Sequence, residues 1–358
     1  MNSLKRLRDR VDHVDRSLLE LLTQRGRLVK AIGAIKEESG QSVFAPERER
    51  DLLARLKEKN HGPLPAEAIE SVFREVIHSC RNLQKAFRVA YFGPQATFTH
   101  QAALRCFGRG AEYLPVRAIS DVFAEVDKDR ADYGVVPIEN STEGVVNHTL
   151  DMFMDSRLSI CAELELPIWH YLLGNAKACR GGKGLKTLYT HYQPLAQCRL
   201  WVESHLPGVA VVEASSTADA ARRAAENPRG AAIASRLAGE LYGLDVLASR
   251  IEDVTHNFTR FLVIGSALPA RTGRDKTSIM FSVKDRVGAL FDMLVPFRKY
   301  RLNMTKIESR PTRQRAWEYL FFVDFLGHRS EPRVQKALAL LERSCVFLKI
   351  LGSYPRSE

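Results

Sequence analysis

The pattern of apolar residues changes twice along the chain, and these changes limit the possible folds. Up to about residue 87, apolar residues recur every three or four positions, which predicts helices. From Arg88, short apolar runs alternate with helical patterns, as in parallel βαβ units. From about Lys276 the predicted order is β-α-β-β-α-β, which is ferredoxin-like. We therefore predict three domains, over residues 1–87, 88–270 and 274–358.

Composition narrows the class of protein. A chain of 358 residues exceeds the size of a single core, and 45% hydrophobic with 27% charged residues is typical of soluble proteins. There is no apolar stretch of about 18 residues and no apolar signal segment, so we expect a cytoplasmic protein without a membrane contact. The net charge of +11 is interleaved with acids along the whole chain, so small anionic substrates explain it without nucleic acid.

Cysteine and glycine patterns exclude several kinds of site. The six cysteines include no CxxC pair, which argues against a disulfide framework and a structural zinc site. Neither glycine cluster, at residues 108–110 and 181–184, completes the GxGxxG pattern after a strand. We therefore expect no metal and no cofactor, and we exclude an NAD-dependent dehydrogenase.

Polar residues interrupt the apolar faces of the helical segment. Arg25 breaks the 3-4 repeat of the first helix, and Lys36 returns close to the same helical face. Gln84 interrupts the apolar stripe of the third predicted helix. A core glutamine bonded to a neighbouring backbone is the ordinary explanation for one such residue. A set of them in so small a domain favours an anion site, because buried charges need partners.

A second set of polar residues lies at strand ends. The run 137–144 is a strand end that enters a polar, glycine-closed turn, and Thr259 and Arg260 precede the apolar strand 261–264. A hydroxyl beside a guanidinium suggests a proton donor next to an anion clamp. On these two residues alone, a β-branched strand residue beside a solvated arginine is an equal alternative.

The helical segment resembles the all-helical chorismate mutase domain. The resemblance implies that Arg8 and Arg25 hold the two substrate carboxylates, with Arg8 reaching into the partner subunit's site. It further implies that Lys36 and Gln84 face the ether oxygen as catalytic groups, and that Arg48, Glu49 and Cys80 are substrate contacts. Ala45 stands where that family usually has an acid, and Cys80 replaces a frequent serine.

Residues 88 to about 268 resemble the prephenate dehydratase family. The resemblance rests on the runs 93–100, 137–144, 190–193 with Gln197 and Cys198, 232–235 and 259–261, which in that family line the cleft. It implies two α/β lobes around a cleft, with Thr259 assisting departure of the ring hydroxyl. His191 is a rival acid, although a satisfied structural histidine is the more ordinary reading. The implied substrate contacts are Thr97, Thr99, Asn140, Ser141, Thr142, His191, Gln193, Arg260 and Phe261. Gln95 and Ala96 replace a common Glu-Gly pair.

The last segment resembles the ACT domain, which in this family binds phenylalanine between paired subunits. The resemblance rests on residues 287–290 at a helix start and 308–311 at a strand end. A helix N-terminus favours a carboxylate, and a glycine there allows close approach. The implied phenylalanine contacts are Gly288, Ala289, Leu290, Glu308, Ser309 and Arg310.

The three resemblances together imply a multidomain fold. Its parts are an all-α helical chorismate mutase-like domain, an α/β bilobal (periplasmic-binding-protein-like) dehydratase domain and an α+β ferredoxin-like ACT domain. The implied substrates are chorismate and prephenate, with phenylalanine as effector, in a homodimer or homotetramer. The alternative is a ligand-sensing bilobal protein with a helical N-terminus for dimerisation or nucleic-acid contact. We also expect a chain ended after about residue 270 to be an active dehydratase that phenylalanine does not inhibit.

Overall fold

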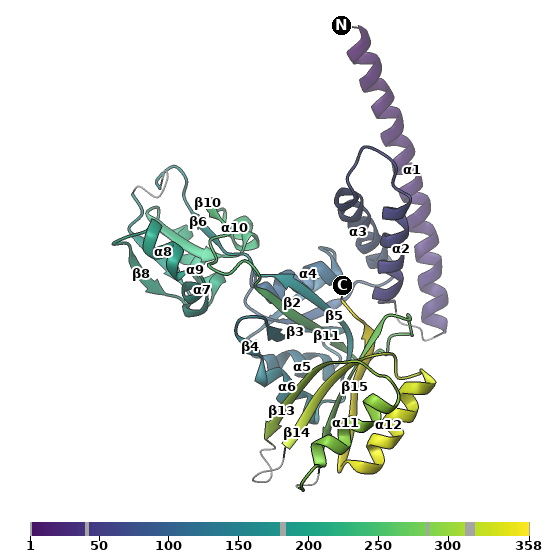
Figure 1. The fold of residues 1–358 in the computed structure, drawn as a ribbon. Coiled ribbons are helices and arrows are strands. Elements are labelled where there is room, and N and C mark those ends of the chain that lie inside the picture. Colours follow the sequence, from purple (N-terminus) through teal and green to yellow (C-terminus); the bar gives the residue numbers. More distant parts are fainter. Residues whose placement is uncertain (1, 40–42, 180–183, 284–285, 312–318, 358) are drawn as a thin grey trace. The chain divides into compact units, whose positions relative to one another are not determined.

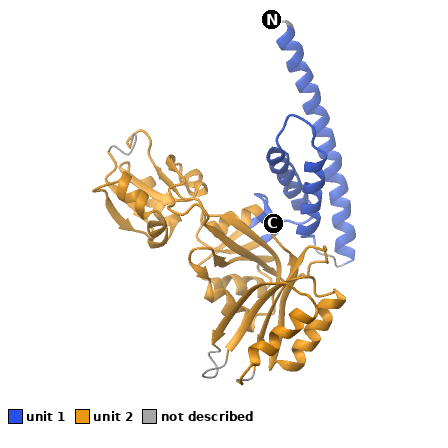
Figure 2. Ribbon diagram, viewed as in Figure 1, with its two compact units in different colours: residues 1–88, 106–112 blue, residues 89–105, 113–358 orange. Residues whose placement is uncertain are grey.

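The computed structural model describes residues 2–39, 43–179, 184–283, 286–311 and 319–357. It divides into two compact units (Figure 2). One unit contains residues 1–88 and 106–112, and the other contains residues 89–105 and 113–358. Among the described residues, no helix combines the length and apolar character needed to cross a membrane.

The first unit is built from the three helices α1 (Asn2–Glu38), α2 (Pro46–Glu58) and α3 (Ala66–Asn82). Pro46 occupies the first turn of α2, where a missing N–H is harmless, and Pro65 precedes α3. Within the described residues, the apolar repeat of the first half of α1 is not covered. Its side chains are more than half exposed, including Leu4, Leu7 and Val11 at 56%, 56% and 58%.

A short segment from the end of α4 (Phe98–Phe107) and the turn after it, residues 106–112, completes the first unit. Arg81 of α3 is 3% exposed and donates from Nη2 to the Cys106 carbonyl at 2.9 Å. Its guanidinium also lies over the rings of Phe44, Phe87 and Phe107, at 5.4 to 5.6 Å. The core of the helical unit therefore includes residues that follow it in sequence.

The second unit begins with a six-stranded sheet of order β2-β1-β3-β11-β5, with β4 paired to β3. Strand β11 runs antiparallel between β3 and β5, whereas β1 and β3 are parallel. The strands are β1 (Arg88–Phe92), β2 (Glu112–Val116), β3 (Tyr133–Asn140), β4 (Gly144–Val145), β5 (Ser159–Pro167) and β11 (Phe258–Gly265); the helices are α4, α5 (Ile119–Asp127) and α6 (Asn147–Asp155).

A five-stranded sheet of order β10-β6-β9-β7-β8 forms the second lobe (Figure 1). Its core is rich in alanine, which lets α9 lie close to β9. The strands are β6 (Tyr171–Gly174), β7 (Thr187–Thr190), β8 (Ala210–Glu213), β9 (Gly230–Ala234) and β10 (Asp245–Ser249). The helices are α7 (Tyr192–Gln197), α8 (Arg199–His205), α9 (Thr217–Glu226) and α10 (Arg236–Tyr242). The chain enters this lobe after β5 and returns through β11.

The C-terminal segment has the predicted β-α-β-β-α-β order, with a four-stranded sheet of order β13-β14-β12-β15. Its elements are β12 (Asp275–Ser282), α11 (Ala289–Lys299), β13 (Met304–Pro311), β14 (Tyr319–Leu326), α12 (Pro332–Ser344) and β15 (Phe347–Pro355). Both helices pack on one face of this sheet. The other face contributes Met280, Phe322 and Leu351 to the core of the first lobe. The two segments therefore share a hydrophobic core.

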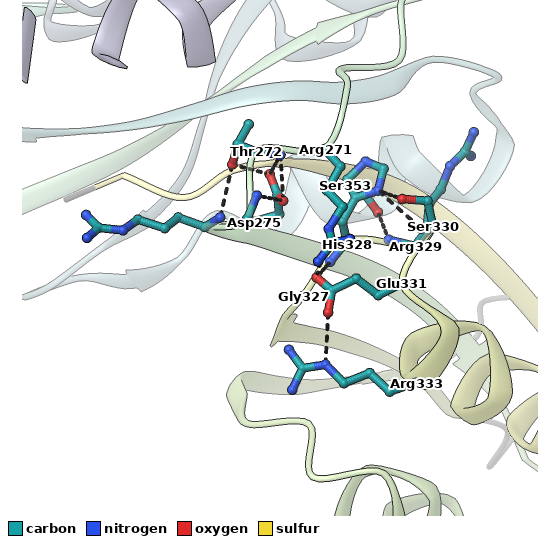
Figure 3. A network of polar contacts seen from close by, with 12 residues as sticks. Arg271, Thr272, Asp275, Gly327, His328, Arg329, Ser330, Glu331, Arg333 and Ser353 are labelled. Carbon is teal, nitrogen blue, oxygen red and sulfur yellow. Dashed lines mark hydrogen bonds and ion pairs between the residues drawn. The ribbon is translucent and has the colours of Figure 1, made fainter.

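Figure 3 shows how the linker into the C-terminal segment is fastened. The Asp275 carboxylate accepts hydrogen bonds from the backbone N–H groups of Thr272 and Gly273, both at 2.9 Å. The Asp275 carbonyl accepts from Gly327 N–H at 2.8 Å, and Glu331 accepts from His328 N–H at 2.9 Å. These bonds hold the start of β12 against the turn that follows β14.

Gly352 of β15 tests the packing of the shared core. A Cβ at this position would lie 2.4 Å from the Ile160 carbonyl oxygen of β5, where backbone cannot yield easily. We expect Gly352→Ala to lower the free energy of unfolding by about 1 to 3 kcal/mol, the usual cost of overpacking. Urea denaturation of the purified variant measures this. Gly62→Ala is the control, because its nearest atom would lie at 3.6 Å; equal stabilities of the two variants would contradict the prediction.

Candidate functional site

A cavity of about 1160 Å³ lies between the two lobes of the second unit. The first lobe lines it at the ends of β3 and β11 and at the start of α4. The second lobe lines it with α7 and with the turn before α9. Predicted site residues that line the cavity are Thr97, Thr99, Asn140, His191, Gln193 and Thr259. Predicted residues absent from its lining are Ser141, Thr142, Arg260 and Phe261.

Asn140 and Thr259 face each other across the paired strands β3 and β11. The Asn140 Oδ1 atom accepts from the backbone N–H groups of Thr142 and Glu143, at 2.9 and 3.0 Å. Because those groups are donors only, the amide nitrogen of Asn140 must point the other way. It donates to Thr259 Oγ1 at 2.8 Å, so the hydroxyl hydrogen of Thr259 is not used in this bond.

Ser141 and Thr142 hold the turn after β3. Ser141 Oγ donates to the His256 carbonyl at 3.1 Å and accepts from Phe258 N–H at 3.0 Å. Thr142 Oγ1 donates to Asn140 Oδ1 at 2.6 Å. Both hydroxyls are therefore engaged in fixing the loop that carries Asn140. We revise their predicted substrate contacts to this supporting role.

Arg260 lies on the opposite face of β11 from Thr259, since adjacent strand residues point to opposite sides. Its guanidinium donates to Glu163 of β5 and to Asp324 of β14, each at 2.7 Å. A third bond of 3.0 Å reaches the Tyr354 hydroxyl of β15. The prediction that Arg260 aligns the substrate is therefore wrong, because its side chain points away from the cleft. Phe261 is likewise a core residue, at 1% exposed.

His191 and the α4 loop have local structural partners. His191 caps α7, and its Nδ1 accepts from Gln193 N–H at 3.5 Å. Burial lowers the pKa of His191, which favours the neutral ring and weakens its case as a proton donor. Thr97 Oγ1 caps α4 by accepting from His100 N–H at 3.3 Å. Ala96 has a φ of 65°, which explains why glycine is common at that position.

His170 and Asn257 were not assigned a role from the sequence, and Gln197 was expected only as part of a run that lines the cleft, which it does. His170 is 1% exposed, and its Nε2 lies 2.8 Å from Gln197 Oε1. Burial lowers the His170 pKa, so its ring is neutral. Gln197 Nε2 donates across the cleft to Glu143 Oε1 at 3.2 Å, and Gln197 Oε1 accepts from Asn257 Nδ2 at 3.0 Å.

The helical unit brings Lys36 close to the start of α2. Burial, and next the charge of Arg48, lower the Lys36 pKa, whereas Glu47 and Glu49 oppose this change. Arg25 Nη1 donates to the Val76 carbonyl of α3 at 3.4 Å. The Glu49 carboxylate is bound by Arg81 at 2.5 Å, a partner that the sequence did not predict. Cys80 is buried on α3, at 7% exposed.

Gln84 follows the end of α3 rather than lying within it. Its side chain packs on Gly33 of α1, where an added Cβ would lie 2.8 Å from the Gln84 Cγ atom. The Gln84 Oε1 atom is buried and has no hydrogen-bond partner among the residues that the structure describes. A glycine inside a helix is unfavourable by roughly 1 kcal/mol relative to alanine. The close approach of the Gln84 side chain explains why α1 has a glycine at position 33 in spite of this cost.

Arg8 does not join these residues within one chain. It is exposed on α1, and a rise of about 1.5 Å per residue places it about 26 Å along the helix from Arg25. The other predicted mutase residues lie in the second half of α1 or on α2 and α3. A single copy therefore lacks the second arginine of the predicted carboxylate pair.

Comparison with known proteins covers each of the three segments. Family models match chorismate mutase type II over residues 7–85, prephenate dehydratase over 89–268 and the ACT domain over 277–341. The bifunctional chorismate mutase/prephenate dehydratase of Aquifex aeolicus is 48% identical over 361 residues, covering 100% of this chain and 99% of that protein. The chain belongs to the bifunctional chorismate mutase/prephenate dehydratase family.

Other similar proteins agree with this assignment. The Pseudomonas aeruginosa member is 44% identical over 366 residues, covering 99% of this chain and 98% of that protein. The structure of Arthrobacter aurescens prephenate dehydratase in complex with L-Phe covers 75% of this chain and 90% of its own, with a TM-score of 0.69 and 38% identity. The predicted fold class is confirmed, and the chain is a chorismate mutase and a prephenate dehydratase with an ACT regulatory domain.

The residues predicted to bind phenylalanine lie at two places in the ACT segment, the start of α11 and the end of β13. Gly288 has a φ of 78° at the start of α11, a conformation that favours glycine, and it lies beside Ala289 and Leu290. On β13, Ser309 is exposed. Arg310, its neighbour, instead donates from Nη2 to both oxygens of Asp151 on α6, at 2.8 and 3.1 Å. The predicted phenylalanine contact of Arg310 is therefore replaced by a bond to the dehydratase segment.

Proposed function

We propose that the interlobe cleft binds prephenate and that Thr259 donates a hydrogen bond to the departing ring hydroxyl. The carrying observation is the direction of the Asn140 amide, which makes Thr259 Oγ1 an acceptor and leaves its hydrogen for the substrate. Thr259 lines the cleft while lying on a rigid strand, as a positioned donor requires.

The reaction itself needs little from the protein beyond orientation and one proton. The C–C bond to the ring carboxylate breaks, its electrons complete the aromatic ring, and the C–O bond to the hydroxyl breaks. The hydroxyl takes up one proton and leaves as water, with carbon dioxide and phenylpyruvate as the other products. Thr259 stabilises charge that develops on the leaving oxygen, and backbone N–H groups at the start of α4 hold a carboxylate.

For the mutase, we propose a site completed by two copies of the chain. Lys36 and Gln84 face the ether oxygen of chorismate, Arg25 holds one carboxylate, and Arg8 of the partner subunit holds the other. The exposed apolar seam of α1 and the distance between Arg8 and Arg25 support a homodimer through this helix. The rearrangement requires no nucleophile, so compact binding and donors at the ether oxygen suffice.

Gln84→Glu is expected to confine mutase activity to acidic pH. A carboxylate accepts but cannot donate, so the ether oxygen loses its donor at neutral pH and regains it when the carboxyl is protonated. The measurement is the mutase rate between about pH 4.5 and 8, with the dehydratase rate of the same protein as its control. Equal mutase rates for variant and wild type at neutral pH would remove Gln84 from the mechanism.

We further propose that phenylalanine inhibits the dehydratase by binding at the ACT segment, with its carboxylate at the start of α11. The relative from Arthrobacter aurescens was solved in complex with L-Phe, which supports this effector. The left-handed Gly288 leaves open space where a side chain would stand.

One coupled assay tests the catalytic proposal: chorismate is supplied to the purified protein, and the formation of phenylpyruvate is followed over time. Accumulation of prephenate without phenylpyruvate would contradict the dehydratase assignment.

A further inference from the structure

Asn257 lies next to the strand that carries Thr259 but has no role in the mechanism above. It is 3% exposed and immediately precedes β11. Its Oδ1 atom accepts from Asn140 Nδ2 of the first lobe at 2.8 Å. Its Nδ2 atom donates to Gln197 Oε1 of the second lobe at 3.0 Å. One buried side chain therefore connects the two walls of the cleft.

The direction of each hydrogen bond in this chain of amides is determined. At one end, backbone N–H groups fix Asn140 Oδ1, so Asn140 Nδ2 must donate to Asn257. Asn257 Oδ1 then faces Asn140, and its Nδ2 must face Gln197. At the other end, Gln197 Nε2 donates to the Glu143 carboxylate, which accepts only. Both ends require the same orientation of Asn257.

This orientation has a consequence for Thr259. Asn140 Nδ2 carries two hydrogens, and Asn257 Oδ1 takes one of them. The second hydrogen is then available to Thr259 Oγ1 at 2.8 Å, which is nearer than the other acceptor in reach, the Phe258 carbonyl at 3.2 Å. On the other side, Gln197 Oε1 accepts from Asn257 and also from the neutral His170 ring, which holds Gln197 at the cleft. Loss of the Asn257 amide would break the chain of hydrogen bonds that connects Thr259, through Asn140, to Gln197 of the second lobe.

We infer that Asn257 is a positioning residue for the dehydratase. It fixes the hydrogen-bond geometry of Thr259 through Asn140, and it sets the position of the second lobe over the reacting group through Gln197. The inference rests on the proposed role of Thr259 as the donor to the leaving hydroxyl. A displacement of about 1 Å from the productive geometry lowers rates by about a hundredfold, so kcat is the quantity that responds.

Asn257→Asp separates the two bonds. The aspartate still accepts from Asn140, but its carboxylate cannot donate to Gln197 Oε1 and repels it. We expect kcat at neutral pH to fall by about 10- to 100-fold, with KM changed less than about threefold. As pH falls through the pKa of the new carboxyl, its O–H donates to Gln197 again. The ratio of variant to wild-type kcat is therefore expected to rise toward acidic pH.

Asn227→Asp is the matched control. Asn227 also accepts from a backbone N–H, that of Arg229, and donates to a side chain, the Tyr189 hydroxyl at 3.2 Å. It is absent from the lining of the cleft. The ratio of the Asn227→Asp kcat to the wild-type kcat is expected to be independent of pH. Asn227 is half-buried, whereas Asn257 is buried. A purely structural effect of replacing an amide by a carboxyl would change the stability of the variants without giving Asn257→Asp alone an acid-dependent kcat.

Three outcomes decide the inference. A lower kcat that recovers in acid for Asn257→Asp alone supports it. Wild-type kcat at neutral pH, or a loss of kcat that does not recover in acid while thermal melting shows a folded protein, overturns it. Asn257→Ala adds a second test, because it removes both bonds and should lose kcat at every pH. If the wild-type chain itself forms no phenylpyruvate, the proposed function fails instead.

Discussion

Thr259→Ala is expected to lower the dehydratase kcat by about two or more powers of ten, the scale of general acid catalysis, while KM changes little. The reason is that a donor to the leaving oxygen matters chiefly in the transition state, where charge develops. The Asn140 amide loses its acceptor but stays fixed by the turn that holds its oxygen. Steady-state kinetics with prephenate measure both constants.

Thr259→Ser is the matched control, because it keeps the hydroxyl and removes only a methyl group. It should retain most of the wild-type kcat, and the mutase rate should be unchanged in both variants. If Thr259→Ala raises KM and leaves kcat intact, Thr259 binds substrate and another group assists the leaving hydroxyl. A serine variant as inactive as the alanine variant would indicate that the methyl group, not the hydroxyl, matters.

The sequence predicted the elements well, because their signals are local. Periodicity, helix-starting prolines and glycine turns predicted three segments, and the structure confirms the ferredoxin-like order of elements at residues 275–355. Arg260 was misplaced even though the relevant rule is simple. Adjacent residues in a strand face opposite sides, so Thr259 and Arg260 cannot both face one cleft. Their neighbouring positions had suggested a shared role that strand geometry forbids.

The contacts among the cleft amides had no local signal, although Gln197 belonged to a run expected to line the cleft. Asn257, Gln197 and His170 are far apart in sequence, and each is an ordinary polar residue until the lobes bring them together. The pairing of Glu49 with Arg81 likewise depends on how α2 packs on α3. Such contacts join segments whose separation in the chain carries no information about their distance in space. A buried polar atom that needs a partner becomes visible only after folding.

The ACT segment stabilises the dehydratase as well as regulating it, which changes an expectation drawn from the sequence. Glu163 has no exposed side-chain surface, and its charged partners are Arg260 and Lys276, at 2.7 and 2.8 Å. Arg260 in turn depends on Asp324 and Tyr354. A chain ended after residue 270 would lose Lys276, Asp324 and Tyr354. It would keep the buried Glu163–Arg260 pair without its other partners.

We therefore expect the chain ended after residue 270 to misfold rather than to remain an active, uninhibited dehydratase. Removing one partner from a buried charge network typically costs about 3 to 5 kcal/mol, a large fraction of the stability of a domain. The apolar partners Met280, Phe322 and Leu351 would be lost from the shared core as well. Circular dichroism and dehydratase assays of the shortened chain test this. A cooperative melt with wild-type kcat would contradict it.

Regulation is better tested in the full-length chain with Gly288→Val. A side chain at a φ of 78° is strained by about 1 to 2 kcal/mol, and a branched one obstructs the start of α11 where we propose the phenylalanine carboxylate binds. The concentration of phenylalanine for half inhibition should rise at least about tenfold, a coupling loss of about 1.4 kcal/mol, with uninhibited kcat unchanged. Calorimetry should show weaker binding of phenylalanine to the variant.

Gly273→Val is the control for Gly288→Val. The φ of Gly273 is 86°, and an added Cβ meets no atom within 4 Å, as at Gly288. If both variants lose inhibition equally, backbone strain rather than the α11 site explains the effect.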